Sequence, residues 1–259
     1  MYHYLKLLTK RRKKVFFNEF DVEYDVKAMS ENSVALFRSL FDIPKYSDLP
    51  ISYSFIAGFK PMMKALTHKH FAFSPLGLIH LTAEFKALFE LDYRQPFTVK
   101  IKVKQNRRHP LGKLIQIESQ FFQNGHCCVI NKNSMLKKLV TMPKQNKLAP
   151  QSFAEPTNIE LNNKVARLYA KASYDFNPIH ISDRLAKLFG MPQAIMHGMY
   201  LGHLVLIKND IKSKRVKLEF KRPCLLPSAV GFANKDEQYQ VFSGSEDLHL
   251  NCKVFATED

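Results

Sequence analysis

The sequence predicts an α+β protein made of two copies of one unit, in which an antiparallel sheet wraps a central helix. Helical patterns are followed by strand patterns twice along the 259 residues. One helical segment of the second half is apolar on most of its surface, so it should be buried. A polar stretch with three prolines, around residues 142–157, separates the two halves. We therefore expect one domain over residues 1–145 and a second over 146–259.

In the first half, the pattern predicts one helix followed by four strands. The helix is expected over residues 59–66, with Pro61 tolerated only near its first turn. In residues 97–104, apolar and polar side chains alternate with the period of two that is typical of a half-buried strand. Three further strands are expected in the segments 79–85, 115–122 and 127–130.

The second half repeats this plan. Val165, Leu168, Tyr169 and Ala172 have helical spacing, and Ser182 can cap a short helix that runs to Phe189. Residues 197–211 form the mostly apolar helix that should be buried, and strands are expected over 216–221 and 248–254.

The composition indicates a reduced, soluble protein. Hydrophobic residues make up 46% and charged residues 24% of the chain, as in ordinary globular proteins. The four cysteines show no metal-ligand spacing, and two of them are adjacent, which disfavours a disulfide between them. No segment resembles a secretory signal or reaches the roughly 18–20 apolar residues of a membrane span. We expect a cytoplasmic location.

The positive charge is concentrated in one part of the chain. Of the formal charge of +16, residues 101–150 contribute ten Lys/Arg against a single acidic residue, Glu118, and residues 10–14 form a second basic run. Such a surface attracts nucleic acid, anionic lipid, the phosphates of coenzyme A or an acidic carrier protein, or it is simply solvated. Nucleic acid is the least favoured partner, because no helix-turn-helix pattern, zinc-finger spacing or aromatic sheet motif accompanies the charge.

The candidate chemistry lies in residues 174–180. Asp175 and His180 stand five residues apart, with Asn177 and Pro178 between them. Proline fixes its own φ and keeps the preceding residue out of the helical region, so the chain turns here and both side chains can face one pocket. An Asp and a His that share one water are suited to general acid–base catalysis. An ordinary Asn-Pro turn is the alternative.

Residues 168–200, which include this turn and His197-Gly198-Met199, resemble the hydratase signature of MaoC-like proteins. That family includes R-specific enoyl-CoA hydratases and 3-hydroxyacyl-thioester dehydratases with the hot-dog fold. In several members, two hot-dog units are fused and only one keeps the motif. The resemblance implies a double hot-dog fold, with residues 146–259 as the catalytic half and 1–145 as the non-catalytic half.

The same resemblance implies roles for individual residues. Asp175 and His180 match the catalytic pair, Asn177 would hold the turn, and the backbone N–H of Gly198 would bind the thioester oxygen. The implied activity is that of a hydro-lyase of fatty-acid metabolism: reversible hydration of trans-2-enoyl thioesters, or dehydration of (R)-3-hydroxyacyl thioesters, carried by coenzyme A or acyl carrier protein. No cofactor and no metal are expected, since there is no ligand cluster and no dinucleotide-binding glycine motif.

Several alternatives stay open. His197 could simply cap its helix, and His203 is expected to be a hydrogen-bonded core histidine. Two positions depart from the family pattern: Tyr174 stands where a small residue is usual, and Leu206-Ile207 replace a Ser-Gly pair. If position 174 requires a positive φ, tyrosine would strain it. A catalytically degenerate acyl-thioester-binding protein and a hot-dog thioesterase are the alternative functions, and the protein could form a homodimer.

Overall fold

The computed structural model describes residues 18–140, 159–244 and 247–256. The chain forms two compact units, and neither is continuous in sequence: Met1–Met29 joins Ser54–Lys144, and Ser30–Tyr53 joins Gln145–Asp259. The segment 30–53, which the sequence analysis placed in the first half, thus belongs to the second unit. The expected linker at 142–157 and the basic run at 10–14 lie outside the described residues.

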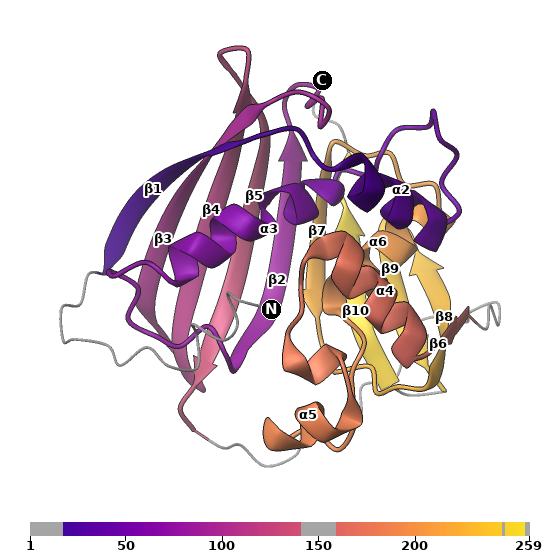
Figure 1. Cartoon of the computed structure of the whole chain (residues 1–259). Coiled ribbons are helices and arrows are strands. Elements are labelled where there is room, and N and C mark those ends of the chain that lie inside the picture. The colour runs from indigo at the N-terminus through magenta and orange to yellow at the C-terminus, as the bar shows by residue number, and fades with distance from the viewer. Residues whose placement is uncertain (1–17, 141–158, 245–246, 257–259) are drawn as a thin grey trace. The chain divides into compact units, whose positions relative to one another are not determined.

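The first unit is an antiparallel sheet packed on one helix (Figure 1). Its strands lie in the order β1-β3-β4-β5-β2. The elements are β1 (Glu19–Val26), α3 (Tyr53–Leu66), β2 (Leu78–Ala87), β3 (Phe97–His109), β4 (Gly112–Gln123) and β5 (His126–Lys138). The four strands expected from residues 79–130 are confirmed, whereas β1 was not predicted.

Helix α3 begins earlier than the sequence suggested. It starts at Tyr53, so Pro61 lies inside the helix and not in its first turn. The prediction was wrong because it took the proline as a sign of the helix start. Proline lacks an N–H and cannot bond the carbonyl of Ala57, four residues earlier. In the same helix, Gly58 lies so close to Phe121 of β4 that an added Cβ would be 2.7 Å from its Cζ.

The alternation of β3 is confirmed, and its lysines have acidic neighbours. Val99, Ile101 and Val103 are buried, while the intervening lysines are exposed. Strand β1 pairs with β3 and carries acidic residues on the same outer face. Lys102 lies 2.6 Å from Glu19, and Lys100 lies 3.4 Å from Glu23. Part of the basic segment is therefore neutralised by β1, 75 or more residues away in the sequence.

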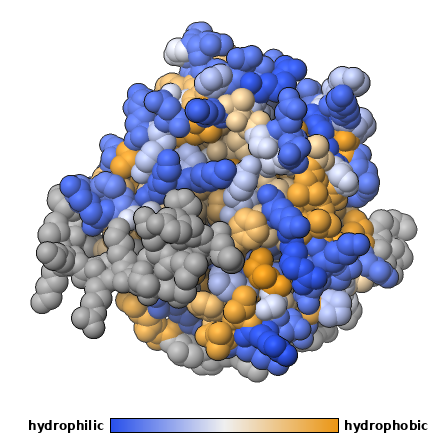
Figure 2. Space-filling view, viewed as in Figure 1, coloured by the Kyte–Doolittle hydropathy of each residue, from blue (hydrophilic) through white to orange (hydrophobic). Residues whose placement is uncertain are grey.

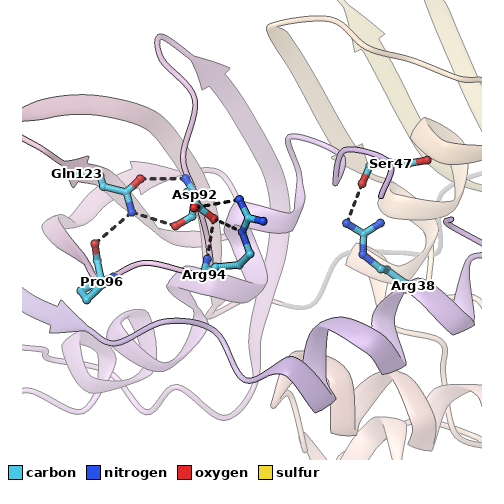
Figure 3. A network of polar contacts seen from close by, with 6 residues as sticks. All are labelled: Arg38, Ser47, Asp92, Arg94, Pro96 and Gln123. Atoms are coloured by element: carbon cyan, nitrogen blue, oxygen red, sulfur yellow. Dashed lines mark hydrogen bonds and ion pairs between the residues drawn. The ribbon is translucent and has the colours of Figure 1, made fainter. Parts of the chain in front are cut away.

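A buried glutamine ties the end of β4 to the loop before β3. The side-chain amide of Gln123 donates to the carbonyls of Asp92 and Pro96 at 2.9 and 3.1 Å, and its oxygen accepts from the N–H of Asp92 at 2.9 Å (Figure 3). Arg94 forms an ion pair with the Asp92 carboxylate at 2.9 Å. The amide satisfies three backbone groups that have left the sheet ladder.

The second unit repeats the plan around helix α6, with strands in the order β7-β10-β9-β8-β6 (Figure 1). Its elements are α2 (Glu31–Leu40), β6 (Ile159–Leu161), α4 (Asn163–Ser173), the 3₁₀ helix η1 (Pro178–His180), α5 (Asp183–Leu188), α6 (Gly198–Lys208), β7 (Arg215–Phe220), β8 (Ser228–Lys235), β9 (Gln238–Ser243) and β10 (Asp247–Val254). Sequence patterns predicted α4, α5, α6, β7 and β10, but not α2, β6, β8 or β9.

Helix α6 is the buried helix that the sequence predicted, although it ends at Lys208 and not at residue 211. Every residue from Met199 to Leu206 is buried. At Gly202 an added Cβ would lie 2.4 Å from Cδ1 of Leu218 in β7, so the missing side chain lets the sheet approach the helix closely.

Helix α2, contributed by the segment 30–53, closes the core of the second unit. Ser33 donates through Oγ to the carbonyl of Ala172 in α4 at 2.7 Å. The ring of Phe37 meets His203 of α6 edge-on at 5.0 Å. Arg38 donates to the carbonyl of Ser47 at 2.7 Å (Figure 3). It also donates to the carbonyl of Pro44 at 2.6 Å, and the two bonds fix the turn after the helix.

The surface is consistent with the composition. Hydrophilic residues occupy much of the face in Figure 2, and apolar residues are interspersed among them. All four cysteines are free thiols, as predicted. Over the described ranges, no helix has the length and apolar character needed to cross a membrane.

Candidate active site

The candidate site begins where α4 ends. Asn162 caps the start of this helix by accepting from the N–H groups of Lys164 and Val165. At the other end Tyr174 adopts the left-handed conformation, with φ 63° and ψ 10°. This position therefore requires the positive φ that would favour glycine, and tyrosine is strained there. The reversal of the chain at Tyr174 directs Asp175 away from the helix axis.

Short-range hydrogen bonds hold the turn from Asp175 to His180. The N–H of Asn177 donates to Oδ1 of Asp175 at 3.2 Å, and Oδ1 of Asn177 accepts from the N–H of Ile179 at 3.4 Å. The N–H of His180 donates to the carbonyl of Asn177 at 2.9 Å. The role expected for Asn177 in holding the turn agrees with these contacts.

His180 is buried, with 7% of its surface exposed. Its Nδ1–H donates to the carbonyl of Ile195 at 2.8 Å, because a carbonyl can only accept. In the neutral ring, the lone pair is therefore on Nε2. Burial lowers the pKa of His180, while the charge of Asp175 and the Ile195 carbonyl act in the opposite direction. A neutral imidazole at neutral pH is suited to accept a proton.

The structure brings His197 to the same place. The ring stacks on that of His180 with 3.8 Å between centroids and 27° between planes. Although His197 occupies the N-cap position of α6, its side chain forms no capping bond. Its Nε2 instead contacts the backbone carbonyl of Asp175 at 3.0 Å. The capping role left open by the sequence is therefore wrong.

Asp175, His180 and His197 meet around a small volume. One carboxylate oxygen and one ring nitrogen from each histidine all lie within 4.8 Å of one another. Two hydrogen bonds of about 2.8 Å through one water can span such a separation. The carboxylate and the imidazole thus face a common region, which is the geometry that an acid–base pair requires.

The same three residues are also a potential metal-ligand set, but their orientation disfavours that use. Metal ligation places the ion in the plane of each imidazole, along the nitrogen lone pair. The two rings here are stacked, with 3.8 Å between centroids and 27° between planes, so an ion bound in the plane of one ring would lie out of the plane of the other. The geometry is better suited to holding a water than a shared ion.

Gly198 begins α6, and its N–H has no partner within the helix. This N–H lies at the positive end of the helix dipole, where it can stabilise a developing negative charge. An added Cβ at Gly198 would lie 2.8 Å from Cδ1 of Phe220 in β7. The space that the missing side chain leaves is therefore filled by the ring of Phe220.

Comparison with known proteins identifies the segment that carries this site. Residues 145–206 match the family model of the MaoC like domain. The segment of the chain that carries the site is thus similar to a MaoC-like domain. The resemblance predicted from residues 168–200 is confirmed.

Three matches to known proteins illustrate the similarity of this chain. The 3-hydroxyacyl-thioester dehydratase X of Mycobacterium tuberculosis (strain ATCC 25618 / H37Rv) is 24% identical over 211 residues, which cover 77% of this chain and 74% of the relative. The crystal structure of HtdX from M. tuberculosis has a TM-score of 0.79 at 23% identity and covers 91% of this chain and 100% of that one. A conserved hypothetical protein of M. tuberculosis with a double hotdog fold has a TM-score of 0.55 at 10% identity, covering 96% of each chain. The predicted double hot-dog fold is confirmed.

One hydrogen-bonded group of buried side chains could not be predicted from the sequence motif. His203 contacts Oγ of Ser52 through Nδ1 at 2.7 Å and Oη of Tyr169 through Nε2 at 3.0 Å, and all three side chains are buried. This confirms His203 as a hydrogen-bonded core histidine, but Ser52 carries no sequence signal that would associate it with α6. The edge of Tyr169 also contacts the His197 ring, with 4.9 Å between centroids.

Proposed function

We propose that this MaoC-like protein is a hydro-lyase that interconverts trans-2-enoyl thioesters and (R)-3-hydroxyacyl thioesters, with Asp175 and His180 as its catalytic pair. The observation that carries the proposal is the convergence of the Asp175 carboxylate and the His180 ring within 4.8 Å. The 24% identity to a 3-hydroxyacyl-thioester dehydratase supports an acyl thioester as the substrate.

The reaction needs a water oxygen at Cβ and a proton at Cα, and one water can supply both. In hydration, the bond from the water oxygen to Cβ forms as the Cα–Cβ π bond opens towards the thioester carbonyl. An O–H bond of that water breaks, and the proton ends on Cα. The Nε2 lone pair of neutral His180 and the carboxylate of Asp175 hold the water and relay its proton. Each group contributes general acid–base catalysis of about 10²–10⁴-fold. Dehydration runs through the same atoms in reverse.

Negative charge develops on the thioester oxygen when Cβ is attacked. In our proposal the N–H of Gly198 donates to this oxygen, at the N-terminus of a helix whose next eight residues are buried. Burial keeps competing water away from the bond and strengthens it. Coenzyme A and acyl carrier protein both present the thioester on phosphopantetheine, so both are candidate carriers.

The test uses the purified full-length chain with crotonyl-CoA and longer enoyl-CoA substrates, and follows the loss of the conjugated enoyl thioester. Asp175→Asn and His180→Gln should each lower kcat by about 10²–10⁴-fold. Asp48→Asn and His126→Gln change exposed residues of the same types and serve as matched controls. Activity that persists unchanged in Asp175→Asn would refute the mechanism.

A second readout separates the proposed reaction from thioester hydrolysis. Hydration leaves the thioester intact, whereas a hot-dog thioesterase releases a free thiol that a disulfide reagent detects. Thiol release without loss of the double bond would overturn the proposal in favour of the thioesterase. Tight acyl-CoA binding with neither reaction would indicate the degenerate binding protein.

A further inference from the structure

His197 is the one residue of the three-residue cluster to which the proposed chemistry gives no role. It is 2% exposed, and its ring makes a T-shaped contact with Tyr169 and stacks on His180. Its contacts reach both members of the catalytic pair: the backbone carbonyl of Asp175 through Nε2, and the ring of His180 through stacking.

The protonation of His197 follows from its surroundings. Burial, together with the neighbouring His180, lowers the pKa of His197 to about 3, so the ring is neutral and carries one N–H. The carbonyl of Asp175 can only accept, so the proton is on Nε2. Nδ1 is then unprotonated and can only accept a hydrogen bond. It is buried without a hydrogen-bond partner among the described residues.

A buried acceptor without a partner is costly, which makes a purely space-filling role for His197 a poor explanation. Leaving such a group unsatisfied costs about 1–3 kcal/mol, and an aromatic ring without nitrogen would fill the same space without that cost. What a phenyl ring would lack is the Nε2–H donor. Two contacts therefore account for an imidazole at position 197: its Nε2–H donates to the Asp175 carbonyl, and its face stacks on the His180 ring.

We propose that His197 is a positioning residue, which fixes the Asp175 backbone through its Nε2–H and supports the His180 ring through stacking. The inference rests on the proposed function, since it assigns a role in the same site. The backbone at Asp175 needs such a support because the preceding residue, Tyr174, is held in the left-handed conformation. A displacement of about 1 Å in a reacting group can cost ~10²-fold in rate.

Three substitutions separate the two contacts. Gln places an amide N–H at the ε position and keeps the donor without the ring. Phe keeps a ring for stacking and lacks the donor. Asn is one bond shorter, so it loses the ring and cannot place its amide at the ε position. We expect kcat to fall ~10-fold in His197→Gln and His197→Phe and ~10²-fold in His197→Asn. KM should change by less than about threefold, because in this proposal the ring acts through Asp175 and His180.

His203→Gln is the matched control. His203 is also buried on α6, and its side chain bonds Ser52 and Tyr169 and neither Asp175 nor His180. This variant should lose stability and retain kcat at temperatures below its melting point. If kcat in the His197 variants fell only in proportion to their loss of folded protein, as in the control, the positioning role would be wrong.

A measurement without substrate distinguishes failure of this inference from failure of the proposed function. Hydrogen exchange of the amides of Asn177, Ile179, His180 and Ile181 reports directly on the turn that His197 holds. Exchange should be faster in His197→Asn than in His197→Gln, whose amide still bonds the Asp175 carbonyl. Faster exchange in a protein without hydratase activity would support the positioning role and refute the function. Unchanged exchange in all three variants would overturn the inference.

Discussion

Tyr174 offers a direct measurement of the backbone strain beside the candidate site. The residue ends α4 with φ 63°, in a region where the Cβ of an L-amino acid crowds the following carbonyl. Replacing Tyr174 by Gly or by Ala removes the same ring and its contacts. The difference between the two variants therefore isolates the cost of a Cβ in this conformation.

The magnitude follows from two opposing contributions. The left-handed conformation costs a residue with a Cβ about 1–2 kcal/mol. Glycine loses more conformational entropy on folding than alanine does, which opposes this by about 0.4–1 kcal/mol. We expect Tyr174→Gly to be more stable than Tyr174→Ala by about 0.5–1 kcal/mol. For a chain of this size, 1 kcal/mol corresponds to a shift in Tm of about 2–4 °C.

Urea unfolding of the full-length chain, followed by circular dichroism, measures the difference as a shift in midpoint at constant slope. Lys171 is the matched control, since it is exposed in α4 and has ordinary helical geometry. There the order should reverse, with Lys171→Gly less stable than Lys171→Ala by about 1 kcal/mol. An alanine at 174 that is as stable as glycine would refute the strain argument.

Two further predictions concern the core of the second unit. Burial lowers the pKa values of His197 and His203 to about 3, so between pH 6.5 and 3 the unfolded chain takes up protons that the folded chain does not. Stability should therefore fall on acidification, by up to ~2 kcal/mol for each histidine between pH 6.5 and 5.0. Denaturant titrations across this range measure the slope, which His203→Gln should reduce; a slope that is the same in this variant would contradict the assignment. In α6, Gly202→Ala places a Cβ 2.4 Å from Cδ1 of Leu218 and should cost about 1–3 kcal/mol. A double-mutant cycle with Leu218→Ala should recover part of this loss, and strictly additive effects would contradict the close contact.

Much of the fold could be predicted because its signals are local. Val99, Ile101 and Val103 alternate with lysines, and a period of two marks a strand with one buried face. The apolar residues of α6 marked a buried helix in the same way. By contrast, nothing local in residues 30–53 indicates which core they join, and it is through Ser33 and Phe37 that α2 packs in the second unit.

By itself, the sequence determined the turn that carries the candidate pair, since Asn177, Pro178 and the spacing from Asp175 to His180 act over six residues. Only the tertiary structure decided that His197, seventeen residues after His180, stacks on that ring and holds the Asp175 carbonyl. It also decided that acidic residues of β1 neutralise the lysines of β3. The physical reason is the same in both cases. Periodicity and turn chemistry report which way a side chain faces, whereas its partner across the core is chosen by packing among distant segments.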